Sequence, residues 1–316
     1  MGVSEGAIKL YFELFDRGLF KNIESVVEMG SQELHLTKDA FEGLVAAAGI
    51  TNYREEDFPD LPNWPEQPRS SSKPFYEMLG AKKYSSIDLN GEHGSIPLDL
   101  NQPLTDASLW GKYDLVADHG TNEHVFNVVE AYRTMHRLCK PGGLMVHMQD
   151  VYGGNGYYNF DTAFFEGMAS ANGYRILFSS FVLNLMRKYL NVPEIRKQKA
   201  GTLDSRQRDQ FLIPLSQELI EVINWSKDHA ELGICYVFQK QSDDDFKIAY
   251  QGSFQSEDQG NLGYQLQFLP NPPSRTYIPL LVADLERELG AIRGGVVARH
   301  LLGRVKKRLK SRLRLR

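Results

Sequence analysis

Apolar residues recur along the chain in two patterns, one with helical spacing and one in short continuous runs. Helical spacing covers residues 8–20, 41–48, 123–138 and 162–171, so a helix is predicted in each of these segments. Several of the short runs end at a glycine or an acidic residue, as buried strands do where they meet a turn. Seven strands are predicted, over residues 25–30, 84–88, 96–100, 113–118, 144–148, 175–183 and 233–238.

Strands and helices alternate from residue 25 to residue 240. This alternation indicates an α/β fold with a largely parallel sheet. Two more helices are expected, a basic one over 184–200 and another over 214–226. Residues 1–240 are therefore expected to form one domain, and residues 241–316 a C-terminal extension.

Residues 51–74 interrupt this pattern. The segment holds five prolines and two clusters of carboxylates, which predicts a loop outside the core. The aromatic residues Trp64, Phe75 and Tyr76 lie in it or next to it. Two interpretations stay open: a lid that closes over a ligand site, and a static surface loop.

The composition is that of an ordinary globular protein. Of the 316 residues, 42% are hydrophobic and 24% are charged, which excludes a disordered or collagen-like chain. There is no run of about 18 apolar residues, so no membrane span is predicted. Cys139 and Cys235 lie far apart and predict neither a disulfide scaffold nor a structural zinc site. The first residues lack the pattern of a signal peptide, so we expect a cytoplasmic protein.

Charge is distributed unevenly along the chain. Residues 304–316 contain eight Lys or Arg and no acidic residue, so the formal net charge of −4 combines a tail of +8 with a body of −12. The acidic body argues against a general nucleic-acid binder. Apolar residues at near-helical spacing within 293–316 predict a basic amphipathic helix that attaches the protein to an anionic membrane surface. A solvated tail, or one that docks on the acidic body, is the alternative.

Polar residues stand where the predicted strands end. In an open parallel sheet the ligand site lies at the carboxyl ends of the strands, near the point where the strand order reverses. A carboxylate after the second strand can accept hydrogen bonds from both hydroxyls of a ribose, so Asp88 is the candidate for that role. The strand ends carry Glu28 and Gly30, then Asp88, Asp99, Asp118 with His119, and His147.

Three motifs resemble those of class I S-adenosylmethionine-dependent methyltransferases. The runs YDLV at 113–116, EHV at 123–125 and RLCKPGGL at 137–144 follow the family's pattern in order and spacing. The turn Glu28-Met29-Gly30 keeps the family's acid and first glycine but lacks the later glycines. The resemblance covers about residues 22–180. It implies a Rossmann-like, mostly parallel seven-stranded sheet with helices on both faces.

The same resemblance implies S-adenosylmethionine as the cofactor. Glu28 and Gly30 would frame its amino-acid end, and Asp88 would bind its ribose. Asp99 and Leu100 would lie against its adenine. The complete set of expected cofactor residues is Glu28, Met29, Gly30, Asp88, Leu89, Asp99, Leu100, Asp118 and His119.

Methyl transfer to a hydroxyl needs a group that removes the hydroxyl proton. Histidine titrates near neutral pH, so His119 and His147 are the candidate bases. His124 is the third histidine expected at the catalytic site, where it would line the cofactor side or orient a neighbouring group. His119 and His147 end neighbouring strands and are expected to share one rim of the sheet. His124 is expected in the first turn of its helix, where Glu123 complements the helix N-terminus. These side chains could also bind a metal, but the acidic pair of metal-dependent methyltransferases is missing and no metal is expected.

A narrower resemblance concerns the methyl acceptor. Residues 120–127, 154–160 and 171–174 are similar to bacterial methyltransferase-domain proteins linked to sugar and surface-polysaccharide modification. Tyr157 and Tyr158 could stack on a sugar or aromatic acceptor, and packing between helices is the alternative. We expect O-methylation of a hydroxyl on a glycan, a sugar or another small molecule.

Other functions remain as alternatives. A non-catalytic cofactor-binding partner in a membrane-associated biosynthetic assembly is the main one, because the glycine turn is incomplete and the extension is long. A nicotinamide-dependent reductase is disfavoured because no GxGxxG motif follows Gly30. An RNA methyltransferase would use the basic tail, but the acidic body argues against it.

Overall fold

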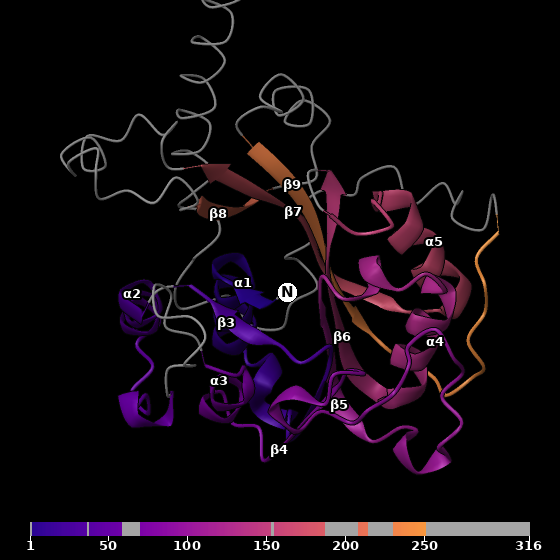
Figure 1. Cartoon of the computed structure of the whole chain (residues 1–316), viewed down its shortest axis with the longest axis horizontal. Coiled ribbons are helices and arrows are strands. Elements are labelled where there is room, and N and C mark those ends of the chain that lie inside the picture. Colours follow the sequence, from indigo (N-terminus) through magenta and orange to yellow (C-terminus); the bar gives the residue numbers. More distant parts are fainter. Residues whose placement is uncertain are drawn as a thin grey trace, which may run out of the picture.

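A seven-stranded sheet forms the centre of the protein, with the strand order β4-β2-β5-β6-β9-β7-β8 (Figure 1). The computed structural model describes residues 2–36, 38–58, 70–152, 155–186, 208–213 and 230–250. The strands are β2 (Ser25–Met29), β4 (Lys83–Ile87), β5 (Tyr113–His119), β6 (Cys139–Tyr152), β7 (Arg175–Met186), β8 (Arg208–Ile213) and β9 (Ala230–Gln239). Neighbouring strands from β4 to β6 pair in parallel, whereas β9 is antiparallel to β6 and β7, and β8 is antiparallel to β7. The sheet is therefore mostly parallel, since only β8 and β9 run against the other strands.

Six of the seven predicted strands are present, and the prediction of a strand over 96–100 is wrong. Only an isolated bridge joins Ile96 to Ile87 there. Pro97 has no N–H to donate, and the Asp99 carboxylate accepts the N–H of Asn101 at 2.9 Å, which turns the chain away from the sheet. The seventh strand is β8, at the opposite edge, for which the sequence analysis gives no element.

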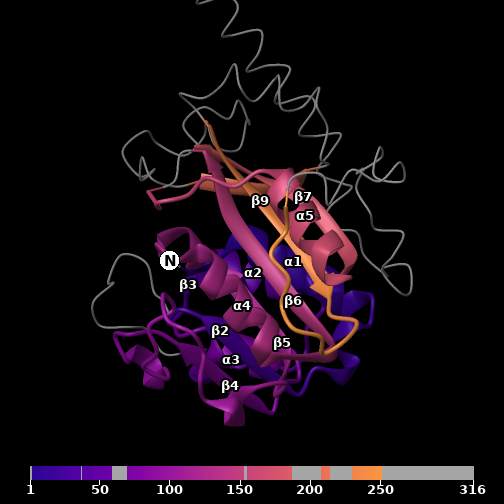
Figure 2. The same ribbon diagram turned by 90° about the vertical axis from the view of Figure 1, so that its right-hand side faces the viewer.

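In the described part of the chain, five α-helices cover the two faces of the sheet (Figures 1 and 2). Three pack on one face and two on the other, as the hydrophobic contacts show. The first group is α1 (Glu5–Asp16), α2 (Lys38–Ala48) and α3 (Lys73–Met78), and the second is α4 (Val128–Leu138) and α5 (Thr162–Asn172). The predicted layers, helices on both faces of an α/β sheet, are confirmed for the described residues.

Helix α4 begins five residues later than the apolar spacing predicts. Residues 122–124 form instead a separate 3-10 turn, η5 (Asn122–His124), which the Asp118 carboxylate holds by accepting the N–H groups of Thr121 and Asn122. Helix α4 ends at Leu138, where the buried Lys240 ammonium donates to the carbonyls of His136 and Cys139. A cation at this position complements the negative end of the helix.

Side chains alternate between two hydrophobic cores along each central strand. Val27 and Val116 pack toward α4 and α5, whereas Val26, Leu115 and Ala117 pack toward α1 and α3. Both faces of these strands are covered, which explains why their sequences are continuous apolar runs rather than alternating ones.

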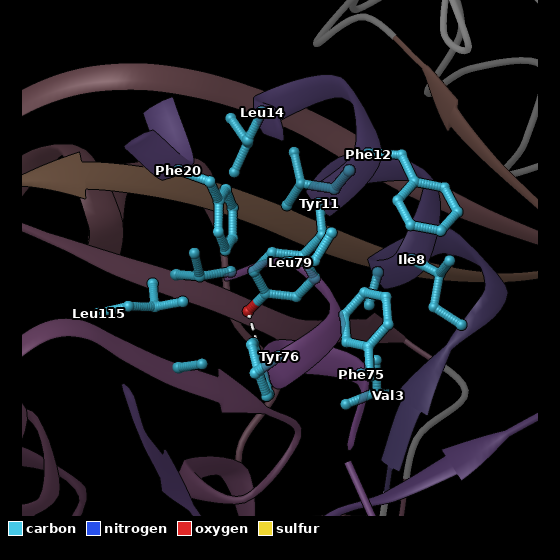
Figure 3. Packing of buried hydrophobic residues seen from close by; sticks show 14 of the residues in the cluster. Val3, Ile8, Tyr11, Phe12, Leu14, Phe20, Phe75, Tyr76, Leu79 and Leu115 are labelled. Atoms are coloured by element: carbon cyan, nitrogen blue, oxygen red, sulfur yellow. Dashed lines mark hydrogen bonds between the residues drawn. The ribbon is translucent and has the colours of Figure 1, made fainter. Parts of the chain in front are cut away.

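The N-terminal helix is anchored by an aromatic cluster. Tyr11 lies edge-on to Phe20, Phe75 and Tyr76, with ring centroids 5.4–5.8 Å apart (Figure 3). Phe75 and Tyr76 belong to α3, immediately after the proline-rich segment, so these two rings are core residues and not part of a lid. Residues 59–69, with Trp64, lie outside the described residues.

The smaller elements complete the fold. Strands β1 (Gly2–Ser4) and β3 (Glu33–His35) form a separate two-stranded parallel sheet. The remaining 3-10 turns are η1 (Leu19–Asn22), η2 (Glu55–Asp57), η3 (Glu92–Gly94) and η4 (Ala107–Leu109).

The C-terminal part is described only to residue 250. Residues 241–250 contain no helix or strand and run beside α4 and α5, where Lys247 donates its N–H to Asn172 Oδ1 at 2.7 Å. The predicted helix over 184–200 is wrong at its start, because 184–186 belong to β7. The rest of that helix, the predicted helix over 214–226 and the basic segment 293–316 lie outside the described residues, so membrane attachment and the domain boundary at 240 stay predictions. In the described part, none of the helices combines the length and apolar character needed to cross a membrane.

Candidate functional site

A cavity of about 480 Å³ lies at the carboxyl ends of β5 and β6. Its walls come from these strand ends, from the small β1–β3 sheet, and from β7, β8 and the start of β9. Among the described residues that line it, Glu123 and Asp150 are acidic and none is Lys or Arg. The remaining polar lining consists of Ser4, three histidines (His35, His119 and His124) and four amides (Gln149, Asn155, Asn184 and Gln210).

Asp118 holds the loop that carries the site. Its Oδ1 accepts the N–H groups of Thr121 at 2.9 Å and Asn122 at 3.2 Å, and the Gln149 amide donates to its Oδ2. Complete burial raises the pKa of Asp118 to about 7. Because its oxygens are used inside the protein, Asp118 shapes the loop and does not face the cavity, unlike the cofactor contact expected of it.

Glu123 lines the cavity, although its sequence position predicts only a role at a helix end. Its Oε2 accepts the Asp150 N–H at 2.9 Å, and its carbonyl oxygen accepts the Tyr157 N–H at 2.7 Å. Burial, together with the charge of Asp150, raises the pKa of Glu123. The signal that could have revealed it is its place directly after a strand end, beside a histidine.

His124, expected from the sequence to line the cofactor side or to orient a neighbouring group, is exposed to the cavity. Its side chain is 30% exposed, and its Nε2 lies 3.5 Å from Glu123 Oε1. Partial burial lowers the pKa of His124, so the imidazole is neutral at pH 7 and can accept a proton. The prediction that His124 stands in the first turn of α4 is wrong, because the residue belongs to the 3-10 turn η5. This turn brings the side chain to the cavity wall.

His119 also lines the cavity, but its ring nitrogens face the protein interior. Nε2 lies 3.1 Å from the Tyr11 hydroxyl, and Nδ1 lies 3.6 Å from Glu28 Oε1. The ring is buried, and it packs edge-on against Tyr11. His119 is therefore better placed to fix the loop after β5 than to act as the predicted base.

Glu28 is a fully buried carboxylate in a network of hydroxyl groups. It accepts hydrogen bonds from Tyr76 and Tyr84, each at 2.7 Å, and from Ser72. The hydroxyls of Tyr76 and Tyr11 lie 3.1 Å apart (Figure 3). The Tyr11 hydroxyl also lies 3.1 Å from His119 Nε2, which joins the network to His119. Burial and the Glu28 charge raise the pKa of Tyr76 and Tyr84, so both hydroxyls stay protonated. Glu28 does not reach the cavity, and its position fits a structural role instead of the predicted contact with a cofactor.

His119 and His147 do not share one rim of the sheet, so that prediction is wrong. His147 pairs in register with Asp118, whereas His119 pairs with Met148. Paired residues of parallel strands point to the same face and successive residues to opposite faces, so the two histidines point apart. His147 is buried among the rings of Tyr132, Phe165 and Phe238, away from the cavity.

The burial of His147 has a measurable consequence for acid stability. Desolvation lowers its pKa from 6.5 to about 3, so the folded protein keeps the ring neutral while the unfolded chain protonates it. The stability from this difference is complete above pH 6.5 and is lost as the pH falls toward 3. We expect His147→Leu to reduce the fall in unfolding free energy between pH 6 and pH 4 by about 1.4 kcal/mol per pH unit. Urea titrations of both proteins at pH 7, 6, 5 and 4 measure this.

His93, which lies on the exposed turn η3 and 3.2 Å from Glu33, supplies the control. His93→Gln should leave the pH dependence close to that of the wild type. Equal slopes for the wild type and His147→Leu would show that His147 is protonated in the folded state, and would contradict its desolvation.

The turn after β2 is packed with protein side chains. Gly30 has φ +84°, and a Cβ there would meet Thr121 Oγ1 at 2.5 Å, so glycine is required. The Gln32 amide donates to the Met29 carbonyl and to Thr121 Oγ1, both at 2.8 Å. The Gly30 N–H donates to the Ile87 carbonyl at 2.7 Å. Met29 and Gly30 therefore hold the turns after β2 and β5 together.

Two of the predicted nucleoside residues, Asp88 and Leu89, directly follow β4, and Asp99 and Leu100 lie in the loop before β5. Asp88 is half-buried and accepts the Ser31 N–H at 3.0 Å, and the Leu89 side chain is 67% exposed next to it. Hydrogen bonds from Asn101 lower the pKa of Asp99, so it is ionised, whereas Leu100 is buried in the core. Asp88, Leu89 and Asp99 are thus accessible to a ligand. The described residues contain no group of three metal-binding side chains arranged to hold a metal ion.

Comparison with known proteins finds similarity only at the level of solved structures. No protein-family model and no curated protein matches the chain. A candidate methyltransferase of Bacillus halodurans C-125 is 11% identical, with a TM-score of 0.37 over 73% of this chain and 99% of that one. A candidate sarcosine dimethylglycine methyltransferase of Galdieria sulphuraria is 11% identical, with a TM-score of 0.37 over 74% and 85% of the two chains. An S-adenosylmethionine-dependent methyltransferase of Archaeoglobus fulgidus is 12% identical, with a TM-score of 0.32 over 74% and 94%. These likenesses are too distant to assign an activity to this chain.

Proposed function

We propose that the chain is an S-adenosylmethionine-dependent methyltransferase that acts on a hydroxyl group of a sugar or another small molecule. The observation that carries the proposal is the cavity at the carboxyl ends of β5 and β6, in which the neutral His124 stands beside Glu123. The accessible Asp88 and Leu89 lie on the same edge of the sheet, where an open α/β fold binds nucleotides.

The residues at the end of β4 fit the nucleoside part of the cofactor. Asp88 uses its oxygens to accept the N–H groups of Ser31 and Asn90 and the Ser31 hydroxyl, and a carboxylate has about four acceptor positions. One position is therefore left for a ribose hydroxyl. Leu89 offers an exposed apolar surface for a base. When bound, the cofactor supplies an electrophilic methyl group.

The chain's own residues supply the proton chemistry. When the acceptor oxygen forms its new bond to carbon, the hydroxyl proton must leave, and His124 is a neutral base at the cavity wall. Glu123 lies 3.5 Å from the imidazole and is itself held by the Asp150 N–H, so it fixes the orientation of His124. The amide side chains of the lining can orient the other hydroxyl groups of the acceptor.

Titration with S-adenosylmethionine and S-adenosylhomocysteine tests the cofactor half of the proposal. We expect the wild type to bind both in the micromolar range, and Asp88→Ala to weaken both by about tenfold to a hundredfold, because hydrogen bonds to a charged group are lost. Isothermal titration calorimetry measures the affinities. Asp245→Ala, which removes an exposed carboxylate in the 241–250 segment, should bind like the wild type. No binding by the folded wild type would remove the cofactor assignment.

A non-catalytic cofactor-binding protein is the second candidate, and the turn after β2 favours it. The Gly30 and Ser31 N–H groups are bonded within the protein, and the Gln32 amide lies against the glycine. A turn filled in this way offers fewer donors to a ligand than a glycine-rich one does. Release of S-adenosylhomocysteine with any hydroxylated acceptor would exclude this candidate.

A further inference from the structure

Two aromatic rings stand exposed in contact with each other at the edge of the sheet that holds the cavity. The side chains of Phe126 and Tyr157 are 74% and 70% exposed, and their rings meet edge-to-face with centroids 5.8 Å apart. Large aromatic side chains are mostly buried in folded proteins, so a contacting pair in water calls for a ligand. We call Phe126 and Tyr157 the aromatic platform.

The platform is held firmly by the backbone around it. The Tyr157 N–H donates to the Glu123 carbonyl at 2.7 Å, and the Tyr158 hydroxyl donates to the Phe126 carbonyl at 2.6 Å. Gly156 packs so closely on Glu123 that a Cβ there would meet the Glu123 carbonyl oxygen at 2.8 Å. The two rings are therefore presented on a fixed support, and a ligand loses little free energy in ordering them.

The platform adjoins the cavity lining, because the Tyr157 N–H is bonded to Glu123, which lines the cavity. Each ring stands two residues beyond a lining residue: Phe126 follows His124, and Tyr157 follows Asn155. A ligand with one end in the cavity can therefore extend onto the rings.

The chemistry of the two surfaces selects one class of ligand. The described cavity lining offers carboxyl, amide, hydroxyl and imidazole groups and no Lys or Arg, which suits a neutral polyhydroxylated molecule better than a phosphate or carboxylate. Exposed aromatic rings bind the apolar C–H face of a sugar ring. We propose that the aromatic platform is a second sugar subsite, so that the acceptor is a neutral oligosaccharide with one residue in the cavity and the next on Phe126 and Tyr157.

This inference rests on the proposed function for the reaction but can fail separately from it. The full chain would be titrated with the methyl glycosides of glucose, galactose, mannose and rhamnose and with the matching neutral homotrisaccharides, by calorimetry. Trigalacturonate serves as the anionic probe. We expect at least one neutral trisaccharide to bind about tenfold or more tightly than its methyl glycoside, and trigalacturonate to bind more weakly.

Variants of the platform assign the difference to the two rings. Phe126→Ala and Tyr157→Ala should each weaken trisaccharide binding about tenfold, leave methyl glycoside binding within about twofold, and leave S-adenosylmethionine binding unchanged. Trp110→Ala is the matched control, because Trp110 is an exposed aromatic residue that precedes β5. It therefore lies at the amino ends of the strands, whereas the cavity lies at their carboxyl ends. This variant should bind every probe like the wild type.

Three results would overturn the subsite. One is equal affinity for monosaccharides and trisaccharides, or no binding of either. Another is unchanged trisaccharide binding in both platform variants. The third is that the wild type self-associates in sedimentation velocity whereas the platform variants are monomeric. The rings would then form an interface between copies of the chain. If the wild type did not bind S-adenosylmethionine but still preferred trisaccharides, the proposed reaction would be wrong and the subsite would stand.

Discussion

We expect His124→Ala to lower kcat for methyl transfer to a hydroxylated acceptor by a factor of about 10² to 10⁴, the usual contribution of a positioned general base. Affinity for S-adenosylmethionine should stay within about twofold, because the proposed nucleoside contacts, Asp88 and Leu89, are not among the cavity-lining residues that include His124. Measuring S-adenosylhomocysteine release under saturating cofactor gives kcat, and calorimetry gives the affinity.

The pH dependence of the wild type provides a second readout of His124. The imidazole must be neutral to accept a proton, and partial burial lowers its pKa below 6.5. The rate should therefore be constant around pH 7 and fall only at more acidic pH, below the ordinary titration range of a histidine. Asp245→Ala, which changes an exposed carboxylate in the 241–250 segment, should keep both the rate and this limb. Full activity in His124→Ala would transfer the base function to another lining residue, with Glu123 the first to examine.

Replacing Glu28 by Ala should cost about 3 kcal/mol or more in the free energy of unfolding. The change removes the carboxylate that Tyr76, Tyr84 and Ser72 share as an acceptor, and each hydroxyl that is left unsatisfied costs about 1–3 kcal/mol. Glu28→Gln keeps the shape and one acceptor oxygen, so it should cost less. Urea unfolding at pH 7, followed by far-ultraviolet circular dichroism, measures both differences.

A surface variant calibrates this result. Glu77→Ala breaks an exposed ion pair with Lys73 and should change stability by less than about 1 kcal/mol. If Glu28→Ala were as stable as Glu77→Ala but failed to bind S-adenosylmethionine, Glu28 would be a ligand contact, as its position after β2 first suggested.

The apolar runs predicted most of the sheet, because strands that are buried on both faces are continuous apolar segments and can be recognised as such. The strand over 96–100 failed because Pro97 lacks an N–H, a local cause that the sequence itself contains. Strand β8 could not be predicted, since it pairs with β7 alone and its sequence, Arg208–Ile213, begins with two charged residues and contains no long apolar run.

For the site, the sequence identified the correct strand ends but not the direction of the side chains. His119 and His147 each follow an apolar run, yet their register places them on opposite faces of the sheet. Register between strands 30 residues apart is set by tertiary packing, so a single sequence does not reveal it. Glu123 was missed for a related reason: an acid before an apolar helical pattern is typical of a helix start, and only the hydrogen bonds of Asp118 turn it toward the cavity.

The walls of the cavity come from both extremes of the described chain. Ser4 and Gln210 both line it, and the Gly6 N–H donates to Gln210 Oε1 at 2.7 Å across 204 positions of sequence. During synthesis, the N-terminal helix must therefore wait for more than two hundred further residues before its contacts with β8 can form. Contacts of such long range slow folding. A ribosome-bound chain that ends before β9 would lack one wall of the cavity, so acceptor binding can begin only after nearly the whole described fold has been made.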